Sequence, residues 1–187
     1  MKLKNIKISN YRCFKKAEID FDDHITLVVG KNGAGKTAIL DTIAVSVSTF
    51  LLGIDGGVSR SILKEDARYE FHNLNGTIDP QHQFPVSIES EGDCLGEQDK
   101  QWLRSLNSEN GKTTIKDASQ ITGIAKKAQN RIMKGDKSLI LPLISYYGTG
   151  RLYAQKKEKR NLQSLTEFKR QVGYVDCMAA ESNEKLM

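Results

Sequence analysis

Two short segments near the start of the chain alternate apolar and polar residues. Apolar side chains recur mostly at every second position in residues 2–9 and at every second position in residues 17–21, which is the period of a strand that exposes one face to water. Together they predict an antiparallel pair of strands. Residues 24–29 are nearly all apolar and rich in β-branched side chains, a pattern typical of a strand buried on both faces in a mainly parallel sheet.

The next apolar pattern has the period of a helix. Apolar residues recur every four positions from Ile39 to Leu51, and this spacing predicts an amphipathic helix from Lys36 to about Leu52. Gly53 then ends it. Residues 58–115 contain short strand-like pieces among Gly, Asn and Asp turn signals, and they predict a small, mostly β insertion.

Two more elements follow the insertion. Residues 117–134 place apolar side chains on one side and basic side chains on the other, which predicts a second helix, and residues 138–147 predict a second buried strand. The expected division of the chain is the strand pair, the strand at 24–29 and the first helix (1–57), the β insertion (58–116), a helix and buried strand (117–152), and a basic, helical-looking C-terminal segment (153–187).

Composition narrows the class of protein. The chain has 187 residues, of which 39% are apolar and 27% charged, as in ordinary globular domains. No apolar run approaches the roughly 20 residues of a membrane span, and the N-terminus lacks the apolar core of a signal peptide. The three cysteines form no C-x-x-C pair, which favours neither a disulfide framework nor a zinc site. We therefore expect a cytoplasmic protein with no membrane partner.

The net charge of +5 is concentrated in one segment. Residues 151–170 contain seven Lys or Arg and two Glu, which leaves 21 basic and 21 acidic residues elsewhere. Within this segment the basic run 156–160 has two interpretations. It either contacts the phosphates of a nucleic acid, with a salt-sensitive affinity, or it is a solvated charged surface.

One motif carries chemistry. Residues 30–37 read Gly-Lys-Asn-Gly-Ala-Gly-Lys-Thr and fit G-x-x-x-x-G-K-[ST] without a mismatch. Glycines let successive backbone amides surround phosphate oxygens, and the following helix directs its positive end at the same anion. Lys36 supplies a charge for the β- and γ-phosphates of ATP, and Thr37 is the candidate ligand of Mg²⁺. The candidate nucleotide-binding residues are Gly30, Asn32, Gly33, Ala34, Gly35, Lys36, Thr37 and Ala38.

The context of this motif resembles a known family. Four segments are similar to the N-terminal lobe of RecF/SMC/ABC-type ATPases. They are the chain from Lys4 to Phe14, residues 17–21, the P-loop and residues 38–43. Residues 141–152 and 173–177 resemble a bacterial branch that includes PtuA-like anti-phage defence ATPases. The resemblance implies an α/β fold of the P-loop NTPase type, an ABC-ATPase head whose N-terminal lobe carries an antiparallel β subdomain.

The resemblance also bears on single residues outside the motif. Arg12 resembles a position that approaches bound nucleotide or DNA in SMC-like heads, and it joins the candidate cofactor-binding residues, although a strand-end arginine in a surface contact explains it equally well. Arg60 resembles the arginine loop of SMC heads, but a solvated turn arginine is the preferred interpretation. Trp102 and Tyr146 are interpreted as core or partly buried residues rather than a platform for adenine.

Two motifs of hydrolysing relatives are missing from the sequence. No run of four apolar residues ends in Asp-Glu, the element that helps hold Mg²⁺ and polarises the attacking water, and no Leu-Ser-x-Gly signature occurs. The resemblance therefore implies half of an ATPase head, which binds Mg-ATP. Hydrolysis then needs a C-terminal lobe and a dimer of heads that sandwich ATP, and the catalytic residues stay unassigned. DNA and an effector nuclease are the further partners implied.

Two alternatives remain open. The chain is either part of such an ATPase or a non-hydrolysing regulatory or assembly subunit that uses ATP to pass its state to an effector nuclease. A small P-loop kinase is a third hypothesis. It is disfavoured because a strand pair precedes the P-loop strand and no arginine-rich lid is apparent in the sequence.

Overall fold

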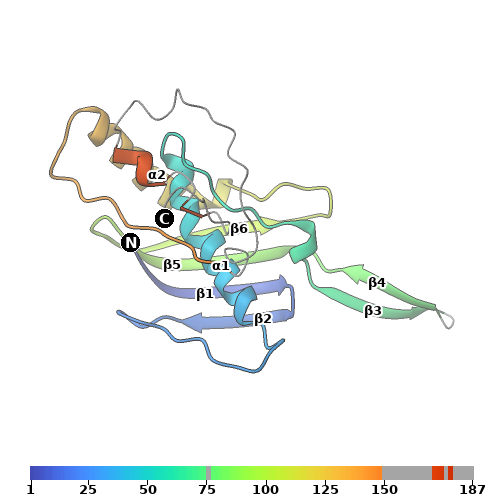
Figure 1. Cartoon of the computed structure of the whole chain (residues 1–187). Helices are drawn as coiled ribbons and strands as arrows, with labels where there is room; N and C mark the ends of the chain where they lie inside the picture. The colour runs from blue at the N-terminus through green and yellow to red at the C-terminus, as the bar shows by residue number, and fades with distance from the viewer. Residues whose placement is uncertain (75–76, 149–169, 175–176, 179–187) are drawn as a thin grey trace, which may run out of the picture.

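The computed structural model describes residues 1–74, 77–148, 170–174 and 177–178. Its centre is a four-stranded antiparallel sheet in the order β2-β1-β5-β6 (Figure 1). These strands are β1 (Lys2–Tyr11), β2 (Phe14–Asp20), β5 (Val86–Cys94) and β6 (Glu97–Leu106). The predicted N-terminal strand pair is confirmed as β1 and β2, and β5 pairs with the other edge of β1.

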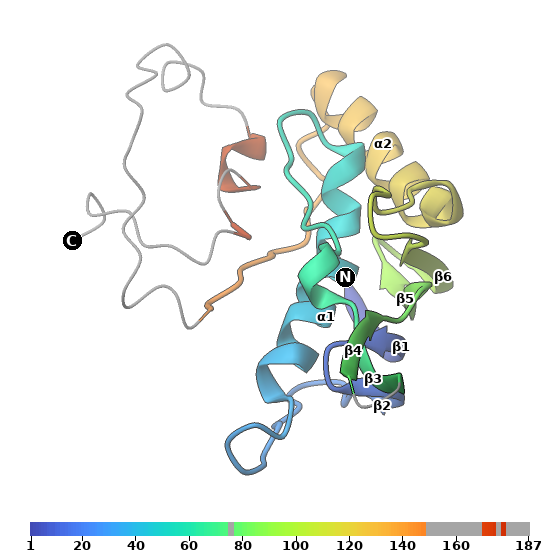
Figure 2. The same ribbon diagram turned by 90° about the vertical axis from the view of Figure 1, so that its right-hand side faces the viewer.

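Helix α1 (Lys36–Ser48) covers one face of this sheet, as Figure 2 shows. Ile6, Ile8 and Ile88 alternate with polar residues along β1 and β5 and are at most 1% exposed, in one core cluster with Ala38 and Val45 of α1. The 3-10 helix η1 (Thr49–Gly53) continues α1. The predicted helix is therefore confirmed, but the predicted stripe is not the buried face. Ala38, Asp41 and Val45 are buried, whereas Ile39, Ile43 and Val47 are only partly buried.

Helix α1 and η1 together are long and apolar enough to pass a length-and-composition test for a membrane span. Most of this segment is buried inside the fold, against the sheet on one side and the second helix near its end. A core helix passes the same test, because burial in protein and burial in lipid select similar side chains.

The second helix, α2 (Ser119–Met133), follows η3 (Lys116–Ala118) and packs on η1 and β6. The two helical segments approach closely at Gly53, where an added Cβ would lie 2.5 Å from the carbonyl oxygen of Thr122 and 2.6 Å from the Cβ of Ala125. The predicted helix over 117–134 is confirmed.

The insertion is β-rich, as predicted, but it divides into two parts. Strands β3 (Tyr69–Leu74) and β4 (Thr77–His82) form a hairpin that projects beyond the main sheet (Figure 1), whereas β5 and β6 belong to the sheet itself. The short helix η2 (Lys64–Asp66) precedes the hairpin. A bridge between Tyr11 and Ala67 ties its base to the end of β1.

The prediction of a buried strand over residues 24–29 is wrong. Among the described residues this segment pairs with no strand, and Ile25, Leu27 and Val29 are 82%, 82% and 81% exposed. The physical reason is the lack of neighbours. A strand is buried on both faces only when other strands and helices surround it, and every strand of the described part of the chain lies in the main sheet or in the β3–β4 hairpin.

The second predicted buried strand, over residues 138–147, is also not a strand in the structure. The segment leaves the end of α2 as an extended trace, orange in Figure 2. Leu139 and Ile144 are buried, but Ile140 and Leu143 are 84% and 98% exposed. Its backbone bond, from Tyr146 to the carbonyl of Cys177 at 2.9 Å, joins it to a turn and not to a sheet.

Only a little of the predicted C-terminal segment is described. The 3-10 helix η6 (Arg170–Tyr174) lies near α1, where Tyr174 and Met178 join the core cluster around Phe50. The basic run 156–160 and most of the helical-looking end lie outside the described residues.

Candidate functional site

The predicted phosphate loop connects residue 29 to the start of α1, and two of its glycines adopt left-handed backbone angles. Gly33 has φ +82° and Gly35, the N-cap of α1, has φ +89°, a region that L side chains enter only at a cost. One loop bond joins the amide of Ala34 to the carbonyl of Lys31 at 3.2 Å. Asn32 is exposed at the tip.

The two glycines have different surroundings. Nothing lies within 4 Å of a Cβ added at Gly33, whereas a Cβ at Gly35 would meet the sulfur of Cys13 at 2.6 Å and the ring of Phe14 at 2.7 Å. Cys13 lies in the tight turn between β1 and β2, and Phe14 is the first residue of β2. This turn therefore supports the loop directly behind the start of α1.

Lys36 is folded back over its own loop. Its ammonium donates to the carbonyl oxygens of Gly30 at 2.7 Å and Lys31 at 2.8 Å. Thr37 is exposed, and the methyl group of Ala38 is buried in the core beneath α1, so Ala38 has only its backbone amide to offer a ligand.

The first amides of α1 are available to an anion. In the described part of the chain no acceptor binds the amides of Lys36, Thr37 or Ala38, and no side chain caps the helix. The positive end of a helix and its unpaired amides attract phosphate. The arrangement therefore fits a bound phosphate group, with the Lys36 ammonium beside it.

The P-loop residues can bind Mg²⁺ only when a nucleotide supplies most of its ligands. Across the described ranges no group of three or more His, Cys, Asp and Glu could hold a metal ion. Mg²⁺ bound to a nucleotide takes most of its ligands from phosphate oxygens and water, so the hydroxyl of Thr37 is sufficient as the contribution of this loop.

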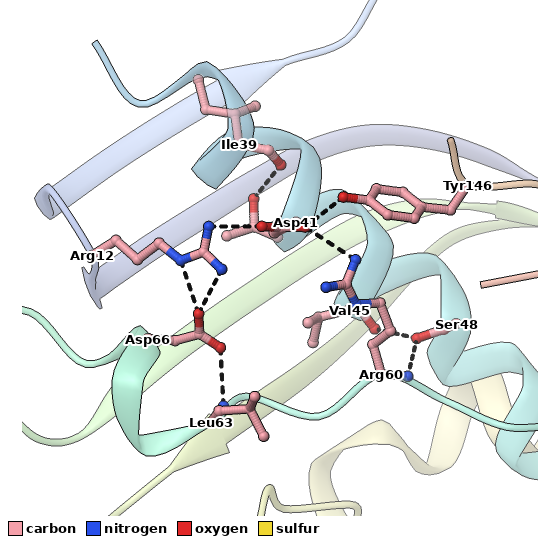
Figure 3. Close-up of polar contacts among 10 residues, drawn as sticks. Arg12, Ile39, Asp41, Val45, Ser48, Arg60, Leu63, Asp66 and Tyr146 are labelled. Atoms are coloured by element: carbon pink, nitrogen blue, oxygen red, sulfur yellow. Dashed lines mark hydrogen bonds and ion pairs between the residues drawn. The ribbon is translucent and has the colours of Figure 1, made fainter. Parts of the chain in front are cut away.

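Arg12 lies in the β1–β2 turn, beside the second turn of α1. Its Nε donates to Oδ1 of Asp66 at 2.8 Å, its Nη2 lies in an ion pair 2.8 Å from the same oxygen, and its Nη1 donates to Oδ2 of Asp41 at 2.6 Å (Figure 3). The structure thus places Arg12 next to the P-loop helix but pairs it with two carboxylates. Sequence reasoning missed both acids. Asp41 carried a signal, because it is the one acidic residue of α1.

The carboxylate of Asp41 accepts hydrogen bonds from two further donors. Its Oδ1 accepts from Nη1 of Arg60 at 3.0 Å and from the hydroxyl of Tyr146 at 2.6 Å (Figure 3). The guanidinium of Arg60 also lies 4.7 Å from the centre of the Tyr146 ring, within the range of a cation–π contact. Burial, and then the hydrogen bond to Asp41, raise the pKa of the Tyr146 hydroxyl, so that it stays protonated as a donor.

The preferred interpretation of Arg60 as a solvated turn residue is wrong, because this contact with a buried carboxylate fixes its side chain. Trp102 is confirmed as a core residue. It is 3% exposed, and its indole N–H donates to the carbonyl of Ser46 in α1 at 3.1 Å. Tyr146 is confirmed as partly buried.

This combination of a P-loop, a helix that begins directly after it and a preceding strand pair agrees with a sequence match. Residues 5–185 match the family described as the AAA domain. The chain belongs to the AAA domain family. Within this family it has the fold class expected from the motifs, the N-terminal lobe of a RecF/SMC/ABC-type P-loop ATPase.

Two curated relatives are similar in sequence to part of this AAA domain. The DNA replication and repair protein RecF of Clostridioides difficile is 35% identical over 74 residues, which are 40% of this chain and 18% of RecF. The DNA double-strand break repair Rad50 ATPase of Methanosarcina mazei is 46% identical over 96 residues, which are 49% of this chain and 9% of Rad50. The chain therefore spans less than a fifth of the length of either relative.

A solved structure is also similar to this AAA domain. It comes from a study described as "Structural biochemistry of ATP-driven dimerization and DNA stimulated activation of SMC ATPases". Its sequence is 18% identical, the TM-score is 0.44, and the match covers 67% of this chain and 80% of that chain.

Proposed function

We propose that this AAA domain binds Mg-ATP at residues 30–37. The observation that carries the proposal is the start of α1, where unpaired amides, two left-handed glycines and the Lys36 ammonium meet. On binding, the ammonium exchanges the carbonyls of Gly30 and Lys31 for phosphate oxygens. The amides of the loop and of α1 surround the β-phosphate, and Thr37 ligates Mg²⁺. Arg12 contributes a charge beside the nucleotide.

Hydrolysis, in this proposal, belongs to a longer protein. A C-terminal lobe supplies the apolar strand that ends in Asp-Glu, and a second head closes on ATP to form a dimer. The name of the Rad50 relative includes ATPase, and both curated relatives are named for DNA repair, which supports ATP turnover coupled to DNA in the cytoplasm. Residues 141–152 support the narrower proposal of an anti-phage defence ATPase.

The second candidate function is a nucleotide-binding subunit that does not hydrolyse ATP and regulates an effector nuclease. One observation favours it for this chain. The buried acids of the described residues, Asp41 in α1 and Asp66 in η2, are both bound to Arg12, so neither is placed to activate a water molecule. The two candidates differ in turnover, which a phosphate-release assay measures.

The experiment that tests nucleotide binding uses the Lys36→Ala variant and a fluorescent ATP analogue. Loss of a charge-assisted phosphate contact is expected to weaken binding by about tenfold or more. Lys31→Ala is the matched control, since it removes the same charge from the same loop, and it should change the affinity by less than about threefold. Equal losses in the two variants, or none, would overturn the assignment.

The metal is tested separately. Thr37→Ala should reduce the gain in affinity that Mg²⁺ gives over EDTA, while leaving binding in EDTA unchanged, because the hydroxyl acts only through the metal. An unchanged Mg²⁺ effect in Thr37→Ala would remove this residue from the site and leave the phosphate contacts intact.

A further inference from the structure

Three donors from separate parts of the chain converge on one buried carboxylate. Arg12 comes from the β1–β2 turn, Arg60 from the segment between η1 and η2, and Tyr146 from the extended segment after α2 (Figure 3). Their common acceptor, Asp41, is 5% exposed and lies five residues after Lys36 on the P-loop helix. The cluster is larger than a single surface ion pair.

The cluster is electrically balanced. The negative charges of Asp41 and Asp66 offset the positive charges of Arg12 and Arg60. Breaking one partner of such a pair is costly, because the other charge is left without compensation in a poorly solvated place. The carboxylates therefore hold both guanidinium groups in fixed positions without any help from a bound anion.

The guanidinium of Arg12 has N–H groups that its contacts with the two carboxylates do not use. A guanidinium has five N–H groups. Two of them donate to Asp66 and Asp41, and Nη2 lies in an ion pair with Asp66. The side chain is 35% exposed, which leaves room for a further acceptor. Arg12 is thus anchored by one part of its fork while the remainder is open to a ligand.

The backbone of Arg12 is fixed as well. Its amide donates to the carbonyl of Asp66 at 2.7 Å, and its φ of +47° is a left-handed conformation that a non-glycine residue keeps only when its surroundings hold it. The next residue, Cys13, touches the P-loop at Gly35. The guanidinium is therefore held at a constant position relative to the start of α1.

We propose that Asp41 is a positioning residue of the nucleotide site: it orients Arg12 toward phosphates bound at the P-loop, and Arg60 and Tyr146 fix the carboxylate that does so. This inference rests on the proposed function, and it adds a residue that touches no phosphate itself. An arginine already held in its bound geometry loses less freedom when the nucleotide arrives.

A double-mutant cycle tests the inference. Asp41→Asn keeps the shape of the side chain and removes its charge, and it is expected to weaken ATP binding by about tenfold in the otherwise unchanged chain. In an Arg12→Ala background the same substitution should change the affinity by less than about twofold, because its effect passes through Arg12. A purely structural role would give the same loss in both backgrounds.

Tyr146→Phe provides a second variant if Asp41→Asn does not fold. It removes one donor to Asp41 and leaves the ion pairs in place, so ATP affinity should fall about threefold in the unchanged chain and not at all with Arg12→Ala. Thermal melting without nucleotide, run on every variant, measures the structural effect separately.

The outcomes are distinct. Equal losses in both backgrounds, tighter binding by Asp41→Asn, or an Arg12→Ala variant with unchanged affinity would each overturn the role of Asp41. Tighter binding would mean that the carboxylate withholds Arg12 from the nucleotide. Failure of the P-loop proposal shows instead as normal ATP binding by Lys36→Ala.

Discussion

Gly35 and Gly33 form a natural pair for testing how the phosphate loop is built. Both have left-handed φ angles, +89° and +82°, so alanine at either position carries the same conformational penalty of about 1–2 kcal/mol. Only Gly35 also lies against other side chains. A Cβ there would stand 2.6 Å from the sulfur of Cys13 and 2.7 Å from the ring of Phe14, closer than real contacts allow.

The magnitudes follow from these distances. Gly33→Ala is expected to lower the free energy of unfolding by about 1–2 kcal/mol, since the new methyl group meets nothing. Gly35→Ala adds the displacement of the β1–β2 turn, and overpacking of this kind costs about 1–3 kcal/mol more. In a chain of this size each kcal/mol corresponds to a fall of about 2–4 °C in Tm.

Urea unfolding followed by tryptophan fluorescence measures both variants, because Trp102 is a core residue under α1. A third variant, Gly35→Ala with Cys13→Ala, removes the sulfur and should recover part of the additional loss. If Gly35→Ala is no less stable than Gly33→Ala, the turn does not support the loop and the reasoning is refuted.

Three other predictions concern the rest of the fold. Leu27→Ala should change the free energy of unfolding by less than about 0.5 kcal/mol, and Ile88→Ala should lower it by about 2–5 kcal/mol, since only Ile88 is buried; similar values in urea unfolding would contradict the exposure of residues 24–29. The hydroxyl of Ser138 and then Arg131 lower the pKa of Asp136 from 3.8 to about 2. The stability from this turn is therefore complete above about pH 4 and lost as the pH falls toward 2; an NMR titration with a midpoint near 4 would refute it. Arg104 is 1% exposed, its Nε has no acceptor among the described residues, and burial lowers its pKa. Its Nη1 donates to the hydroxyl of Thr49 at 3.1 Å, but no carboxylate in the described part of the chain pairs with it. Arg104→Met should consequently raise the urea midpoint or leave it unchanged, and a clear fall would contradict this lack of a counter-ion among the described residues.

The parts of the fold that could be predicted from the sequence are those with local causes. Alternation in residues 2–9 and 17–21 predicted β1 and β2, and the helical period predicted α1 and α2. Helix α2 buries the predicted apolar side, whereas α1 leaves Ile39, Ile43 and Val47 only partly buried. The P-loop was recognisable for a similar reason, since its chemistry lies in contiguous residues 30–37. Such patterns need no knowledge of distant partners.

The parts that could not be predicted depend on distant partners. Residues 24–29 have the composition of a buried strand, but burial depends on which strands lie beside them, and in the described structure none does. Likewise, the pairing of Asp41 with Arg12 and Arg60 joins positions 29 and 19 residues apart. A single acidic residue in a helix indicates a polar contact without naming its partner.

The strand pair β1–β2 supports the P-loop structurally, in addition to being a feature of the family. Cys13 of the β1–β2 turn and Phe14 at the start of β2 lie against Gly35, and the turn holds Arg12 against Asp41 of the P-loop helix. The described P-loop therefore takes its support from the antiparallel sheet and not from a parallel one. Since a phosphate site must be rigid to bind without reorganisation, changes in this turn should alter nucleotide affinity even though its sequence contains no part of the motif.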